Sequence, residues 1–150
     1  MLTNLKRAAL AALCTGMAAC GATLPQGAAL TPAGALEARA AMATVAPIAG
    51  LTPERMYATR IHIGTTENLS LIDRSCQFDG KTRNYGDHFD ILILYSPTQG
   101  DVRCGTALFH ELYHVALILK TGDGDAEHLN PQWGLVDQLA FTHTVCGETL

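Results

Sequence analysis

The segment His110-Glu111-Leu112-Tyr113-His114 combines residue types that can hold a metal ion and activate a water molecule. In a helix, residues four apart lie on one face, about one turn apart, so the imidazoles of His110 and His114 can reach the same ion. Glu111 is rotated by roughly 100° from His110 and can reach a metal-bound water without being a ligand. This spacing predicts a zinc site with two histidine ligands and Glu111 as the general base.

The residues around this segment predict a helix that is buried on nearly all sides. Residues 107–119 contain no Gly or Pro, and Glu111 is their only carboxylate. A helix that is apolar nearly all round packs inside a protein, and polar groups on it need partners there. The alternative is an amphipathic helix with these residues on the surface, but the flanking sequence offers no polar face. We expect a helix over residues 107–120 that ends at Gly122.

The third zinc ligand is expected in the loop that follows this helix. A hydrolytic zinc site usually has three protein ligands and one open position for water. Two glycines in loop 122–128 allow it to fold back over the helix. His128 is the predicted ligand, because it lies just before an expected helix cap and neutral imidazole suits zinc. The alternative ligands are Glu127, Asp125 and Asp123. A calcium site made of these carboxylates lacks the EF-hand spacing, and a solvated acidic turn is the non-functional alternative.

Other polar residues have less specific roles. The candidates to orient a ligating histidine through its second ring nitrogen are Asp123, Asp125 and Asp137. Tyr95 and Tyr113 are candidate phenol donors to an oxyanion, and Trp133 fits either the core or a substrate wall. The remaining histidines are predicted to be structural or surface residues: His62, His88 and His143.

Three segments before the motif have strand character, and one segment after it has a helix start signal. The strand candidates, rich in β-branched, aromatic or aliphatic residues, are 56–63, 68–74 and 88–95. The polar segment 79–86 is predicted to be a loop. Asn130 followed by Pro131 predicts a helix over 131–142.

The N-terminal residues 1–19 have the pattern of a secretory signal. Lys6 and Arg7 precede an apolar run that is too short to span a bilayer. Small residues directly before Cys20 resemble a bacterial lipobox, which predicts lipidation of this cysteine. The expected protein is exported and held at a cell-envelope membrane, periplasmic or outer, through the lipid on Cys20. The alternative is a soluble secreted protein, cut after Ala19 without a lipid.

Composition divides the rest of the chain into a tether and one domain. Residues 20–50 are rich in Ala, Gly, Thr and Pro and predict a flexible tether, with a short Ala-rich helix at 33–44. Residues 51–150 are predicted to form the metal-binding domain. The chain of 150 residues has a net charge of −4 and no run of Lys or Arg, which excludes nucleic acid as a partner.

The cysteines predict one disulfide. Outside the signal and the lipobox, the chain has Cys76, Cys104 and Cys146. An odd number in an oxidising compartment gives one disulfide and one free thiol, and all three pairings remain open.

The segment Ala-Leu-Phe-His-Glu-Leu-Tyr-His-Val-Ala, residues 107–116, resembles the extended motif of the zincin metallopeptidases. The resemblance implies an α+β fold: a minimal zincin-like domain with a small, mostly antiparallel sheet packed on the motif helix, plus a C-terminal helix. It also implies zinc on His110 and His114 and Glu111 as the catalytic base. Metzincins continue with Gly and His where this chain has Leu117 and Lys120, so that branch is rejected.

Two functions follow as expectations. The first is a zinc-dependent hydrolase, a metallopeptidase that acts on a peptide or protein substrate. The alternative is a non-catalytic, zinc-stabilised envelope lipoprotein or binding module, because a domain this small leaves little room for a cleft.

Overall fold

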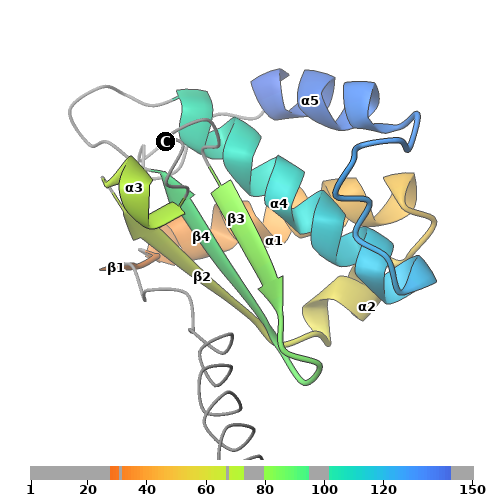
Figure 1. Cartoon of the computed structure of the whole chain (residues 1–150), viewed down its shortest axis with the longest axis horizontal. Coiled ribbons are helices and arrows are strands. Elements are labelled where there is room, and N and C mark those ends of the chain that lie inside the picture. Colours follow the sequence, from red (N-terminus) through yellow and green to blue (C-terminus); the bar gives the residue numbers. More distant parts are fainter. Residues whose placement is uncertain (1–27, 31, 67, 73–79, 95–101, 143–150) are drawn as a thin grey trace, which may run out of the picture.

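The computed structural model describes residues 28–30, 32–66, 68–72, 80–94 and 102–142. In chain order the elements are β1 (Ala28–Ala29), α1 (Pro32–Ile48), α2 (Pro53–Tyr57), β2 (Ile61–Thr66), α3 (Leu69–Ile72), β3 (Gly80–Asn84), β4 (Phe89–Leu94), α4 (Val102–Thr121) and α5 (Trp133–Thr142). One sheet separates α3 from α1 and α4, which lie on its other face (Figure 1). The molecule is therefore α+β, with the motif helix α4 packed against a sheet.

The sheet is mixed, with strand order β1-β2-β4-β3. The short β1 and the edge strand β3 pair antiparallel with their neighbours, as expected for a mostly antiparallel sheet. The central pair β2–β4 is parallel, with Ile61 opposite Phe89 and Thr66 opposite Leu94. The sheet was predicted to be mostly antiparallel; the outer pairings are antiparallel, and the parallel central pair makes the sheet mixed.

The side chains of β4 point alternately to the two faces of the sheet, and each face has its own hydrophobic cluster. Phe89, Ile91 and Ile93 are buried in the main core with the helices. Leu92 points to the opposite face, where it forms a small cluster with Ile72 of α3. Side chains of a strand alternate between the two faces, so the apolar run of β4 reflects burial on both sides.

Helix α4 is buried as the sequence predicts. From residue 107 to residue 117, only His110 and His114 are partly exposed, and every other residue is buried. The helix ends at Thr121, and Gly122 follows with φ of +84° and an N–H that donates to the carbonyl of Ile118 at 2.8 Å. This left-handed glycine turns the chain back over the helix.

The sequence misassigned three elements before α4. Residues 53–57 form a helix, so strand β2 begins at Ile61 instead of at Met56 and continues to Thr66, past the predicted end at Ile63. Residues 69–72, inside the second strand candidate, are helical. The predicted loop 79–86 contains strand β3. Pro53 at the first helical turn explains α2, and the polar residues of β3 are typical of an edge strand, which periodicity does not reveal.

Helix α1 includes the Ala-rich helix predicted at 33–44, and it packs against α4 although residues 20–50 were predicted to be a tether. Ala38, Ala41, Val45 and Ala46 are buried in the main core. The small side chains let the two helices approach closely, so the Ala-rich composition reflects packing here. The predicted signal at 1–19, the lipidation site Cys20, and Cys76, Tyr95 and Cys146 lie outside the described residues.

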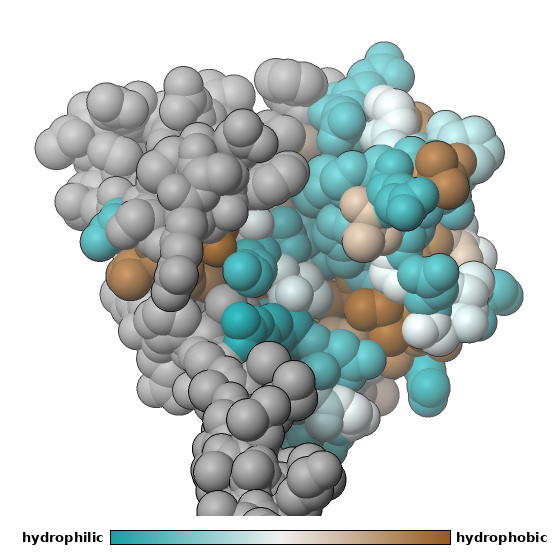
Figure 2. Space-filling model, in the orientation of Figure 1, coloured by the Kyte–Doolittle hydropathy of each residue, from teal (hydrophilic) through white to brown (hydrophobic). Residues whose placement is uncertain are grey.

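The described surface in Figure 2 is largely hydrophilic, with hydrophobic groups scattered between polar ones. Among the described residues, no helix is both long enough and apolar enough to cross a membrane.

Candidate metal centre

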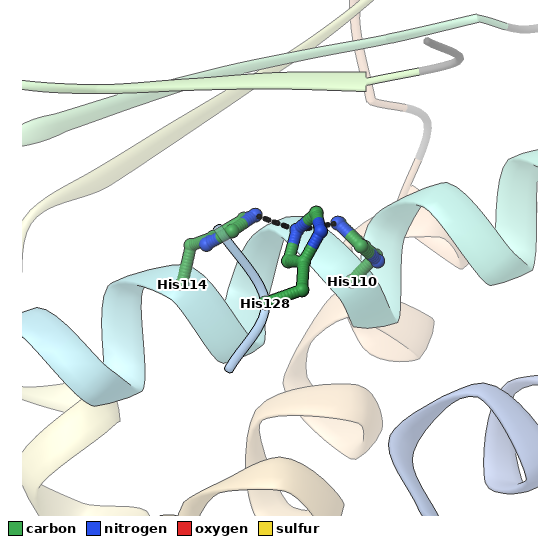
Figure 3. A group of neighbouring side chains, drawn as sticks. All are labelled: His110, His114 and His128. Carbon is green, nitrogen blue, oxygen red and sulfur yellow. Dashed lines mark hydrogen bonds between the residues drawn. The ribbon is translucent and has the colours of Figure 1, made fainter. Parts of the chain in front are cut away.

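The side chains of His110, His114 and His128 converge on one point beside α4 (Figure 3). The Nε2 atom of His128 lies 3.1 Å from Nε2 of His110 and 3.3 Å from Nε2 of His114. We call these three residues the helix cluster. Two nitrogens bound to a tetrahedral zinc ion at its usual bond length lie about 3.3 Å apart. The helix cluster therefore has the spacing of three ligands of one ion and could hold a metal.

The second nitrogens of two of these rings face acceptors. Nδ1 of His114 lies 2.6 Å from the carbonyl oxygen of Gly124. Because a carbonyl can only accept, this Nδ1 carries the hydrogen, and the Nε2 of the neutral ring presents its lone pair to the cluster. Nδ1 of His110 lies 3.8 Å from a carboxylate oxygen of Asp137, which favours the same tautomer.

Asp125 organises the loop that carries His128. Its carboxylate accepts hydrogen bonds from the backbone N–H of Leu129 at 2.9 Å and of Asn130 at 2.7 Å. It also accepts one from Nε1 of Trp133 at 2.7 Å. These bonds lower the pKa of Asp125, the Trp133 bond most of all, so the carboxylate stays ionised. Asp125 is thus a loop anchor, whereas the sequence offered it as a ligand or as a partner of a ligand.

The loop conformation is strained at two positions. Asp125 and His128 have φ values of +53° and +54°, a region that residues with a side chain rarely adopt. Such strain persists only where neighbouring contacts fix the backbone, and it is common at functional sites. Here the contacts of Asp125 hold His128 over the helix.

The ring of Trp133 packs against all three histidines of the helix cluster. Its ring centroid lies 4.5–4.7 Å from the centroids of all three imidazoles. The Trp133 ring also contacts the ring of Tyr113, with the centroids 4.7 Å apart in an edge-to-face arrangement. Tyr113 is fully buried, its hydroxyl has no hydrogen-bond partner among the described residues, and it does not line the cleft beside the three histidines. The tryptophan belongs to the core and also fixes the three rings.

Glu111 is buried against the edge strand β3. Only 6% of its surface is exposed, and its Oε2 accepts a hydrogen bond of 2.6 Å from Oγ1 of Thr82. Gly80 leaves the space for this carboxylate, because a Cβ at that position would lie 2.7 Å from both Cγ and Oε1 of Glu111. Gly80 and Thr82 thus determine where the carboxylate lies.

The electrostatics of the centre favour neutral histidines. Burial, together with the neighbouring His114 and His128, lowers the pKa of His110 to about 4. Burial also lowers the pKa of His114. Near neutral pH these two rings carry no proton on the ligand nitrogen, which is the form that binds metals. Burial raises the pKa of Glu111 to about 7, against the opposing effect of the Thr82 hydrogen bond.

A cleft of about 310 Å³ joins the helix cluster to Glu111. It is lined by β3 on one side, by α4 in the middle and by residues 123–128 of the loop on the other. A small molecule or an extended chain segment can therefore approach the histidines and the glutamate from the same side.

The structure brings together the residues that the sequence placed in the site, and it adds others. His110, His114, Glu111 and His128 all line the cleft. The alternative ligand Glu127 is exposed and is absent from the ligand groups found among the described residues. The sequence missed the parts supplied by Gly80, Thr82 and the carbonyl of Gly124. Gly80 and Thr82 lie in a polar segment that was predicted to be a loop, so no pattern placed them beside Glu111. The position of a backbone carbonyl cannot be predicted from residue type.

Comparison of the chain with protein-family models, with curated proteins and with solved structures found no match. The class that the fold and the centre define is thus a small α+β protein with a three-histidine cluster on a buried helix and its following loop.

Proposed function

We propose that this protein is a zinc-dependent hydrolase that cleaves peptide bonds, with zinc held by His110, His114 and His128. The observation that carries the proposal is a buried carboxylate, Glu111, in the same cleft as three convergent imidazoles. Three neutral nitrogen ligands suit zinc and leave one coordination position for water. A bound zinc ion would supply a water molecule of lowered pKa and would polarise the scissile carbonyl.

Glu111 acts as the general base in this proposal. Its carboxylate takes a proton from the water and then delivers it to the leaving amine. The raised pKa of Glu111, about 7, is near the pH at which a group can both accept and release a proton. Thr82 positions the carboxylate through its hydrogen bond to Oε2, and β3 forms one side of the cleft.

The test is peptide hydrolysis by the zinc-loaded protein and by Glu111→Gln. We expect Glu111→Gln to retain one zinc ion in the helix cluster and to lose activity by about 10²–10⁴-fold, the usual contribution of a general base. Glu127→Gln is the matched control, because Glu127 is an exposed carboxylate in the adjacent loop. Full activity of Glu111→Gln would rule out the mechanism.

A second candidate function is a zinc-stabilised, non-catalytic module that binds a partner. The packing of Trp133 of α5 against all three imidazoles favours it, since a metal that joins α4 to the loop would also fix the surface on which α5 packs. In that case zinc would raise the thermal stability of the wild type and of Glu111→Gln equally, and neither would hydrolyse peptides.

The proposed location is the cell envelope, with the chain anchored by a lipid on Cys20 and its substrate a peptide or protein. Incorporation of a labelled fatty acid into the wild type and its loss in Cys20→Ser test the anchor. Equal labelling of the two proteins would contradict it.

A further inference from the structure

A second group of possible metal ligands lies on β2 and at the start of β4. It consists of His62, His88 and Asp90, which we call the strand cluster. One ligand atom from each residue lies within 4.8 Å of the others. Nδ1 of His62 is 3.1 Å and Nε2 of His88 is 3.6 Å from the same oxygen, Oδ1 of Asp90.

The parallel pairing of β2 with β4 creates this group. His62 and Asp90 are register partners, so their side chains leave the sheet on the same face. Asp90 lies between Phe89 and Ile91, which both point into the main core with α4. The strand cluster is therefore on the opposite face of the sheet from the helix cluster, and the two groups are separate sites.

Asp87 fixes the orientation of His88. Nδ1 of His88 lies 2.7 Å from Oδ1 of Asp87, and the ring of Tyr85 stacks on the imidazole at 4.7 Å with an angle of 10°. A carboxylate only accepts, so Nδ1 carries the hydrogen, and the neutral ring directs the Nε2 lone pair at Asp90. When His88 is neutral, this Nε2 and Oδ1 of Asp90 are two acceptors that lie 3.6 Å apart, an arrangement that a cation between them would stabilise.

Two arginines compete with a metal at this position. Nε of Arg60 donates to Nε2 of His62 at 3.2 Å, which keeps the hydrogen of the neutral ring on Nδ1, facing Asp90. A metal on Nδ1 requires Arg60 to release Nε2, and the Arg60 side chain, 64% exposed, can turn into solvent. Arg83 is the register partner of Asp90 on β3, so its charge also lies on this face. The cations lower the affinity for a divalent ion.

We propose that the strand cluster is a second metal site, weaker than the helix cluster, for a divalent ion that accepts imidazole and carboxylate ligands. Zn²⁺, Cu²⁺ and Ni²⁺ belong to this class. The site does not depend on the proposed hydrolase function, because it shares no residue with that cleft.

Titration of the full chain with Zn²⁺ against a chromophoric chelator tests the proposal. The wild type should bind two ions, and His114→Ala should retain one weaker site. Adding His62→Ala to His114→Ala should abolish that remaining site. The proposal is overturned if His114→Ala binds no zinc, or if its binding is unchanged by His62→Ala; circular dichroism of each variant verifies that it is folded.

Two variants outside the ligand set separate a specific site from general surface binding. Asp87→Asn should weaken the second site by about tenfold, because it removes the partner that orients His88. Arg60→Met should tighten it several-fold, because it removes a competing donor and a positive charge. Unchanged affinity in both variants would contradict the geometry described above.

The chain's single tryptophan distinguishes the two sites in the same protein. Trp133 contacts all three imidazoles of the helix cluster, so Cu²⁺ bound there should quench its fluorescence. The first equivalent of Cu²⁺ should quench strongly, and the second should bind with little further change. His62→Ala should remove only the second step, and removal of the first step instead would overturn the assignment.

Discussion

The helix cluster and the strand cluster offer similar ligand atoms on opposite faces of one sheet, and they differ in what surrounds those atoms. Around the helix cluster lie a tryptophan, a backbone carbonyl and the carboxylate of Asp137. Around the strand cluster lie Asp87 and the two arginines Arg60 and Arg83. The Nε2 atoms of the first face one another, whereas the ligand atoms of the second are partly engaged with neighbouring charges. Supporting residues, more than ligand types, separate a tight metal site from a weak one.

The largest expected difference between the clusters is in zinc affinity. His114→Ala should weaken zinc binding at the helix cluster by at least about a thousandfold, roughly a third of the binding free energy typical of a structural zinc site, which leaves the strand cluster as the site detected in that variant. His62→Ala, the matched variant on the other face, should leave zinc binding at the helix cluster unchanged. Competition with a chelator of known affinity measures both. A large loss in His62→Ala and none in His114→Ala would reverse the comparison.

Glu111 should destabilise the metal-free protein at high pH. Its pKa is raised from 4.5 to about 7 in the folded chain. The contribution of Glu111 to the free energy of unfolding is therefore fully present below pH 4.5 and is lost as the pH rises through 7. The free energy of unfolding of Glu111→Gln should therefore exceed that of the wild type by on the order of 3 kcal/mol at pH 9 and equal it at pH 4. Urea denaturation at the two pH values measures this. An equal difference at both would contradict it.

His110 should destabilise the metal-free protein at low pH. Its folded pKa is about 4, below the ordinary value of 6.5, so its contribution is complete above pH 6.5 and is lost as the pH falls through 4. Between pH 7 and pH 4, Glu111→Gln should lose on the order of 2 kcal/mol of unfolding free energy, and Glu111→Gln with His110→Gln should lose less. Both proteins carry Glu111→Gln because the titration of Glu111 would otherwise change the free energy of unfolding in the opposite direction over this pH range. If the free energy of unfolding falls equally with pH in the two proteins, groups other than His110 cause the loss, which would contradict the prediction.

The smallest expected effect concerns Thr82, which positions Glu111. Thr82→Val removes the hydrogen bond that lowers the pKa of Glu111, so the acidic limb of the activity profile should move up by at most about one pH unit. Thr82→Ser retains the hydroxyl and should restore the wild-type profile. A lower rate with an unmoved profile in Thr82→Val would indicate a structural role alone.

The sequence predicted the parts of the centre that lie on α4 because local pattern determines them. A four-residue spacing on an apolar helix places His110 and His114 on one face without any knowledge of the fold. His128 was predicted from chemistry and from the turn signals around its loop. Its position depends on the anchoring of Asp125 by Trp133, a contact across the start of α5.

The parts that the sequence did not predict depend on contacts between distant segments. Strand β3 is polar, with Lys81, Thr82 and Arg83 in succession, so it has the composition of a loop while forming one wall of the cleft. The strand cluster depends on the parallel register that sets His62 beside Asp90. Its histidines were predicted to be structural or surface residues, because pairing between strands cannot be read from either segment alone.

Zinc K-edge X-ray absorption of the full chain loaded with one equivalent of zinc tests the central claim most directly. The helix cluster predicts three imidazole nitrogens at about 2.0–2.1 Å and one oxygen from water. Glu111→Gln should give the same spectrum, because the glutamate is not a ligand. Two imidazoles with carboxylate oxygens would place the ion at the strand cluster, and sulfur at about 2.3 Å would place it at a cysteine. Either spectrum would contradict zinc binding by His110, His114 and His128.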